Sequence, residues 1–170
     1  MPTALQDRPP FAGHSPQQER PLGAYLSLAP VYTGLCGAFG LWLRRADRTL
    51  PERVETRDLV VLGLATHKAS RILTKSRALS AVRAPFTRFQ GDAGPGEVDE
   101  AARGHGVRRA VGELLVCPYC VAVWIATLFA CGLVAAPRFT RFAAGILTMV
   151  FGSDVVQLAY ARAEKALAAA

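Results

Sequence analysis

Three long apolar runs constrain this 170-residue chain more than any other feature of its sequence. Leu22–Leu43 holds 22 residues without a charge, and Leu114–Pro137 holds 24. A third run, Phe142–Ala161, carries a single charged residue, Asp154. A helix that crosses a bilayer needs about 20 predominantly apolar residues. A soluble fold of this length rarely needs three such runs, so the sequence predicts an all-α integral membrane protein, a bundle of three or four helices.

The charged residues are gathered in blocks between these runs. They make up 19% of the chain, and the excess of basic residues gives a formal net charge of +7. Such basicity is typical of nucleic-acid binding, of a membrane surface, or of loops that follow the positive-inside rule. The apolar runs favour the membrane, and no recognised nucleic-acid-binding fold accompanies the charge. We therefore expect the lipid bilayer as a partner and no nucleic acid.

The sequence divides into a tail, a first membrane helix and a larger domain. Residues 1–21 are polar and rich in proline, and we expect a disordered tail there. Residues 22–43 form an uncleaved transmembrane helix that ends at Trp42, a residue type common at the membrane interface. Residues 57–165 form the larger domain, with an amphipathic or spanning helix, a basic loop and two transmembrane helices.

The first helix of the larger domain, expected over about residues 57–74, is ambiguous in its relation to the membrane. Only the eight residues Leu59–Thr66 are without charge. His67, Arg71 and Lys75 follow at a spacing that places them on one helix face. Such a helix either crosses the bilayer with its polar stripe turned inward or lies at the interface. The sequence leaves both possibilities open.

A long loop and two further helices are expected in the rest of the domain. The loop covers residues 76–110, and its part from 91 to 106 is rich in glycine and acid, as in a flexible linker. The third helix is predicted to start around Gly112–Cys117 and to end by Pro137. The last helix is predicted over about Phe139–Lys165.

Lysine and arginine are unevenly distributed between the connecting segments. Residues 68–109 contain nine of them, residues 44–57 contain five, and residues 138–141 contain two. The positive-inside rule then places the long loop in the cytoplasm, whether or not the 57–74 helix spans. We expect a multi-pass protein of the cell inner membrane, with the Cys117–Cys120 pair on the cytoplasmic side.

The sequence Cys117-Pro118-Tyr119-Cys120 is the most informative chemical motif. The same spacing occurs in dithiol redox enzymes, where a helix N-terminus stabilises the first thiolate. Two thiolates also supply half of the four ligands of a structural zinc site, so zinc is a possible cofactor, although the chain has no second CxxC. The third interpretation is that both cysteines pack as small apolar residues.

Charged and polar residues at membrane depth form a second candidate site. His67, Arg71 and Asp154 belong to it, with Lys68 beside them, and we expect Asp154 to pair with Arg71. The functional interpretation is a site for an ion, a proton or a lipid headgroup. The structural interpretation is a packing ion pair, with the longer basic side chains reaching to the headgroups.

A basic segment from Lys68 to Arg88 carries six basic residues and no acid. A cytoplasmic basic segment beside a helix attracts anionic lipids, although ordinary topology-setting charge has the same composition. Within the segment and just after it lie four residues that we expect at the membrane interface: Pro85, Phe86, Arg88 and Phe89.

Three segments, taken in order, resemble a known family. LGLATHKASRIL at 62–73 is similar to an LATxRLTRLL-like opening, and APFTRF at 84–89 to a PFRRF-like step. GELLVCPYCVAVW at 112–124 is similar to a GELLxCPYCxGxW core, with Ala122 in place of a glycine. Together they resemble the bacterial and phage family catalogued as domain of unknown function thirteen-sixty, over about residues 57–161.

The resemblance implies a membrane protein whose activity is not established. It marks a set of core residues within the strongest motif: Gly112, Glu113, Pro118, Tyr119 and Trp124. It supplies no catalytic residue.

The sequence thus favours a non-catalytic, envelope-associated or partner-binding membrane protein, because no complete catalytic set is present. Its partners would be other membrane proteins or further copies of itself. The alternatives are a thiol-redox or metal-binding protein that uses Cys117 and Cys120, and a small transporter or channel subunit that uses Asp154 and Arg71.

Overall fold

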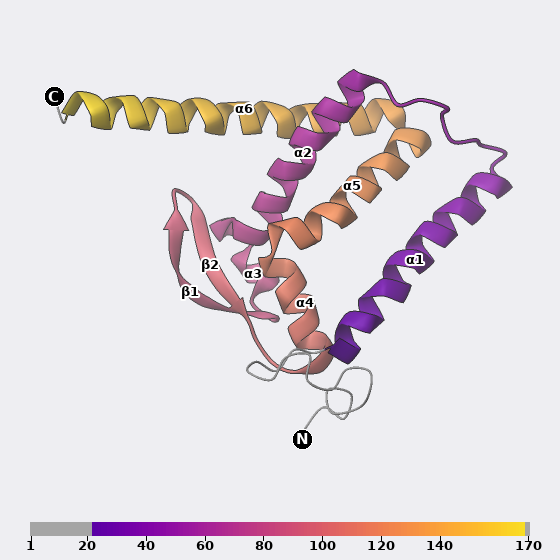
Figure 1. The fold of residues 1–170 in the computed structure, drawn as a ribbon, viewed down its shortest axis with the longest axis horizontal. Coiled ribbons are helices and arrows are strands. Elements are labelled where there is room, and N and C mark those ends of the chain that lie inside the picture. The colour runs from indigo at the N-terminus through magenta and orange to yellow at the C-terminus, as the bar shows by residue number, and fades with distance from the viewer. Residues whose placement is uncertain (1–21, 169–170) are drawn as a thin grey trace. The chain divides into compact units, whose positions relative to one another are not determined.

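The computed structural model describes residues 22–168 (Figure 1). These residues fall into two compact units. The tail predicted at residues 1–21 lies outside the described residues. The first unit contains residues 22–49 and 74–120, and the second contains residues 50–73 and 121–168. The elements are, in chain order, α1 (Leu22–Arg45), α2 (Thr56–Lys75), η1 (Arg77–Leu79), α3 (Ser80–Arg83), β1 (Thr87–Gly94), β2 (Glu97–Ala102), α4 (Gly106–Val116), α5 (Pro118–Ala135) and α6 (Pro137–Ala168).

The predicted all-α class is confirmed, with a small two-stranded sheet added to it. Among the described residues, three helical segments are long and apolar enough to cross a membrane: Tyr25–Arg45, Pro118–Ala135 and Pro137–Ala168. Large apolar side chains on the last two remain exposed, with Leu128 at 70% and Phe142 at 69%. Apolar side chains that no protein atom covers are what a lipid-facing helix presents, so the chain has the features of a membrane protein.

The prediction of a flexible linker between residues 91 and 106 is wrong. β1 and β2 pair as an antiparallel hairpin, with Thr87 opposite Ala102 and Phe89 opposite Glu100. Gly94-Pro95-Gly96 spans the turn between the strands, and such glycine–proline clusters are turn formers. Three of the acidic residues that suggested a solvated linker, Asp92, Asp99 and Glu100, are held in ion pairs, so the segment folds although its composition is polar.

The predicted third helix is in fact two helices. α4 ends at Val116 and α5 begins at Pro118, because Cys117 between them has extended backbone angles, φ −105° and ψ 103°. The residue before a proline disfavours the helical region, since the proline ring collides with its backbone. Pro118 therefore starts one helix and ends the preceding one.

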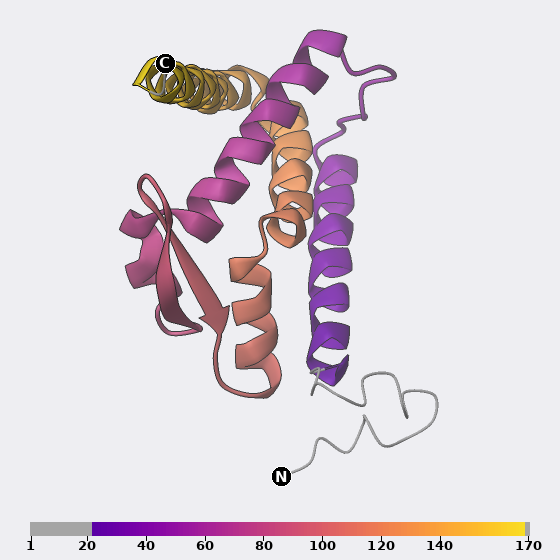
Figure 2. The same ribbon diagram turned by 60° about the vertical axis from the view of Figure 1, so that its left-hand side comes forward.

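In the first unit, α4 packs against β2 and also contacts α1. Figures 1 and 2 both show β2 between β1 and α4. In the second unit, α5 and α6 approach closely at their turn. A Cβ atom on Gly132 would lie 2.7 Å from Oγ1 of Thr140. Only glycine allows the two helices this separation.

Candidate functional site

A glycine on α4 brings two of the sequence motifs together in the first unit. Gly112 is buried, and a Cβ atom there would collide with the carbonyl oxygen of Phe86 and lie 3.0 Å from Cβ of Ala102. Nearby, Nε of Arg108 donates a hydrogen bond to the carbonyl oxygen of Pro85 at 2.8 Å. Pro85 and Phe86 therefore pack directly against α4, which contains Gly112, the first residue of the core motif.

Beneath this contact lies a buried charge network that the sequence did not reveal. Arg83 is fully buried, and its Nε and Nη2 donate to the two carboxylate oxygens of Glu100 at 2.8 and 3.2 Å. The guanidinium also donates to the carbonyl oxygen of Ser76 at 2.9 Å, and Oγ1 of Thr87 donates to Glu100 at 2.9 Å. The network ties α3 to both strands of the hairpin.

The pKa of Glu100 shows whether burial or hydrogen bonding dominates in this network. Burial alone raises it, but hydrogen bonds from Arg83, Ser80 and Thr87 outweigh burial, and the pKa lies below its usual value. The pKa of Asp99 is also lowered, chiefly by the hydrogen bond from Lys75 at 2.7 Å. Both carboxylates are therefore ionised at neutral pH.

Ion pairs partly neutralise the charge of the basic segment from Lys68 to Arg88. Lys75, Arg77 and Arg83 each contact an acid of the hairpin, the Arg77–Asp92 pair at 2.8 Å on the surface. Those acids follow the segment in sequence and offset part of its charge in space. Arg88 and Phe89 remain exposed on β1, Phe89 at 60%.

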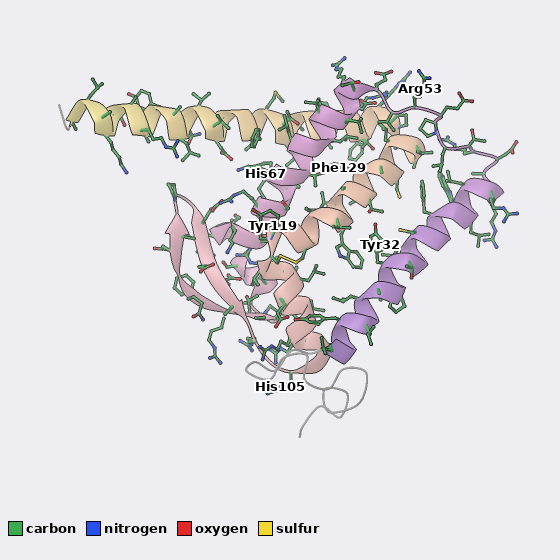
Figure 3. All side chains as sticks on the ribbon, viewed as in Figure 1. Tyr32, Arg53, His67, His105, Tyr119 and Phe129 are labelled. Atoms are coloured by element: carbon green, nitrogen blue, oxygen red, sulfur yellow. A yellow bond between two sulfur atoms is a disulfide. The ribbon has the colours of Figure 1, made fainter. Side chains whose placement is uncertain are left out.

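The two cysteines of the CPYC motif are joined by a disulfide at the start of α5 (Figure 3). Their Cα atoms lie 5.3 Å apart. The Cys120 backbone N–H donates to the carbonyl oxygen of Cys117 at 3.1 Å and to its Sγ at 3.2 Å. Tyr119, between them, is 86% exposed. The motif is thus accessible and bonded, not packed as two small apolar side chains, while Cys36 and Cys131 lie outside the disulfide.

Ligands for a metal ion are few around this pair. Within residues 22–168, no group of three or more His, Cys, Asp or Glu is arranged to hold a metal. The ring of His67 makes an edge contact with the ring of Phe151 at 5.3 Å. A zinc site stays a prediction.

A polar seam joins α2 to α6 in the second unit. Near the start of both helices, Nη2 and Nε of Arg141 donate to the carboxylate of Asp58 at 2.7 and 2.9 Å. Further along, Oγ1 of Thr148 donates to the carbonyl oxygen of Val61 at 2.9 Å. Still further, Lys68 forms an ion pair with Asp154. Asp58, the carbonyl oxygen of Val61 and Lys68 of α2 therefore face α6.

This seam modifies the predicted intramembrane site. His67 and Asp154 do lie at the α2–α6 contact, but the ion pair found for Asp154 is with Lys68. Pairing of Asp154 with Arg71 stays a prediction. Asp58 and Arg141 were not singled out from the sequence, because they lie 83 residues apart and outside the apolar runs.

The remaining core residues lie around the CPYC turn. Glu113 accepts from Nε of Arg109 at 3.0 Å on α4, and Trp124 is half-buried on α5.

The network of Arg83 and Glu100 was missed because Arg83 belongs to the basic segment and Glu100 to the supposed linker. The sequence of β2 carries no clear strand signal, because one of its two buried residues is the charged Glu100 and the other is Val98.

The sequence matches the family described as protein of unknown function (DUF1360) over residues 61–160, which is more than half of the chain. The match contains the opening, the step and the core motif. No curated protein and no solved structure matches the chain.

Proposed function

We propose a function for a chain that belongs to the DUF1360 family of proteins of unknown function: it is a multi-pass membrane protein that exchanges its Cys117–Cys120 disulfide with thiols of a partner protein. The observation that carries the proposal is an accessible CPYC disulfide where a membrane helix begins. In proteins that exchange disulfides, the cysteines sit in such positions at helix N-termini.

The register of α2 against α6 supports a fourth membrane crossing. Asp58 pairs with Arg141 near the start of both helices, and Lys68 pairs with Asp154 further along both. The two helices therefore run in the same direction. α2 has 20 residues, and at 1.5 Å per residue it is about 30 Å long, the thickness of the hydrocarbon core.

A surface position for α2 conflicts with this register. If α2 lay on a membrane face, Asp58 and the start of α5 would share that face, because no crossing would separate them. α5 would then cross, and Arg141, just after the α5–α6 turn, would lie on the opposite face. The 2.7 Å ion pair between Asp58 and Arg141 supports the crossing instead.

Four crossings bring the start of α1, residues 76–117 and the end of α6 to one face. The nine lysines and arginines of residues 68–109 favour the cytoplasm for that face. The protein then belongs to the cell inner membrane, with the CPYC turn exposed to the cytoplasm. Disulfides in that compartment are mostly transient and serve catalysis or sensing. A bond at this place is therefore better suited to exchange than to holding the fold.

A non-catalytic, partner-binding role at the envelope is the second candidate. It is favoured by the exposure of two aromatic side chains in the first unit, Tyr119 at 86% and Phe89 at 60%. Aromatic residues are enriched in protein interfaces and at membrane interfaces. Under this proposal the first unit binds another membrane protein, a further copy of the chain or, through Arg88 and Phe89, anionic lipid.

Alkylation with mass detection separates the two candidates. The full chain in lipid nanodiscs, with Cys36 and Cys131 changed to alanine, is equilibrated with reduced and oxidised glutathione in varied ratio and then alkylated. Thiol exchange predicts that Cys117 and Cys120 gain two alkyl groups together as the ratio becomes reducing, and lose them when it is reversed. A pair that stays in one state at every ratio refutes thiol exchange and leaves partner binding.

Topology is tested with single cysteines in a cysteine-free chain. Arg53→Cys marks the link between α1 and α2, and Arg103→Cys marks the segment between β2 and α4. Four crossings predict that an impermeant maleimide labels only Arg53→Cys in intact cells and labels both after permeabilisation. Equal labelling of the two positions in intact cells would contradict a spanning α2.

A further inference from the structure

The two sulfur atoms of the disulfide are not equivalent. Cys117 is half-buried and ends α4, where its backbone N–H donates to the carbonyl oxygen of Leu114 at 3.3 Å. Cys120 is exposed and lies in the first turn of α5. The neighbouring Tyr119 is 86% exposed. An incoming thiol therefore meets Cys120 first.

Exposure favours attack at Cys120, whereas stabilisation of a negative charge on sulfur favours Cys117. Sγ of Cys117 accepts the backbone N–H of Cys120 at 3.2 Å, so it occupies the position of an N-cap acceptor for α5. A thiolate at Cys117 would turn this into a charge-assisted hydrogen bond, at the positive end of the helix dipole. Cys117 is thus prepared to leave as an anion, and a well-stabilised thiolate is the better leaving group.

We propose that exchange at the CPYC motif runs through Cys120: a partner thiolate attacks Sγ of Cys120, and Cys117 is the leaving thiolate. The proposal rests on the thiol-exchange function above and assigns a role to each sulfur. It reverses the order of the dithiol redox enzymes with this spacing, in which the first cysteine of the motif is the one stabilised as a nucleophile.

The reaction balances with a dithiol protein as the reductant. One partner thiolate forms a bond to Sγ of Cys120 as the Cys117–Cys120 bond breaks, and its electron pair goes to Cys117. The partner's second thiolate then attacks the partner sulfur of the mixed disulfide and expels Cys120 as a thiolate. The partner leaves with a disulfide, and the CPYC pair, reduced by two electrons, takes up two protons from the two partner thiols.

Glutathione serves as the probe for the first step. The oxidised full chain in nanodiscs, with Cys36 and Cys131 changed to alanine, is exposed to reduced glutathione for short times and quenched with acid and a maleimide. Fragmentation of the peptide that spans the motif then shows which cysteine carries glutathione. We expect glutathione on Cys120 and maleimide on Cys117, in about tenfold excess over the reverse.

Variants make the assignment independent of the lifetime of the adduct. Cys117→Ser and Cys120→Ser are each converted to their mixed disulfide with glutathione, and release of the protein thiolate by added reduced glutathione is then timed. Because Cys117 is the better stabilised thiolate, it should leave from Cys120→Ser about ten times faster than Cys120 leaves from Cys117→Ser. Adducts mainly on Cys117, or equal rates in the two variants, overturn the assignment and leave thiol exchange standing. Absence of any adduct and of any reduction in the wild-type pair overturns thiol exchange itself.

Discussion

Replacing Arg83 with methionine should open the hairpin of the first unit. Methionine fills much of the space of the arginine stem but leaves the carboxylate of Glu100 without its bidentate partner. The side chains of Arg83 and Glu100 are 0% and 4% exposed, so water does not replace the lost contacts. The carbonyl oxygen of Ser76 and Oγ of Ser80 lose the same guanidinium donor.

The expected cost follows from the burial of the remaining charge. Removing one partner of a buried ion pair typically costs about 3–5 kcal/mol, because the other partner is left desolvated and unpaired. At about 1.4 kcal/mol for each factor of ten, even the lower figure corresponds to a roughly 100-fold increase in the open population of the hairpin. Changing both residues, Arg83→Met with Glu100→Leu, should recover most of this loss, since a paired charge and an apolar pair of similar volume are of similar stability.

Amide hydrogen exchange of peptides covering residues 87–102, measured by mass spectrometry in nanodiscs, reports this open population. Arg77→Gln is the matched control, because its ion pair with Asp92 joins side chains that are 61% and 69% exposed. Exposed pairs contribute about 0–1 kcal/mol, so its exchange should change little. Equal exchange rates in Arg83→Met and Arg77→Gln would refute the claim that the buried network holds the hairpin.

Three further predictions concern the two units separately. The pKa of Glu100 in the folded protein is lowered, so the stabilisation from its ionised form is complete at neutral pH and is lost as the pH falls below about 4.3, the ordinary pKa of glutamate. Below that pH, amide hydrogen exchange of the hairpin, corrected for its intrinsic pH dependence, should accelerate, and it should accelerate less in Glu100→Gln. Gly112→Ala should destabilise the same peptides by about 1–3 kcal/mol, because the new Cβ atom collides with the carbonyl oxygen of Phe86. Gly63→Ala on α2, with nothing within 4 Å of its Cβ, should be neutral or stabilising. Equal effects of the two substitutions would contradict the close approach of Gly112 to Phe86. Lys68→Met should lower the thermal stability of the detergent-solubilised protein, and adding Asp154→Asn should restore part of it; no recovery would exclude the ion pair as the cause.

The membrane helices could be predicted from the sequence because their signal is local. An uncharged run of about 20 residues has few structural uses other than crossing a bilayer, and the bounds of α1 and α6 follow the expected ranges to within a few residues. The break between α4 and α5 also has a local cause in Cys117-Pro118. It was missed because the apolar run continues through it without interruption.

The hairpin could not be predicted in the same way, since its stabilising contacts join residues distant in sequence. One of the two buried positions of β2 is Glu100, so the strand lacks the alternation of apolar and polar residues that marks a strand. Its partner Arg83 lies 17 residues earlier, among basic residues that a sequence pattern assigns to solvent or lipid. In α2, similarly, Lys68 and Arg71 share a face, and spacing alone does not decide which of them meets Asp154.

The membrane face on which the CPYC turn lies determines what its disulfide does. On the oxidising face the bond would stay closed, and it would fasten α4 to α5 across the extended Cys117 as a permanent staple. On the cytoplasmic face the thiol pools reduce it continually, so it persists only while an oxidant or a partner disulfide renews it. The basic residues of the 68–109 segment favour the second case. Labelling of Arg103→Cys and the glutathione titration therefore test one another. A cytoplasmic turn whose disulfide does not respond to glutathione would be inconsistent with the proposed chemistry. A periplasmic turn whose disulfide is readily reduced and reoxidised would be equally inconsistent with it.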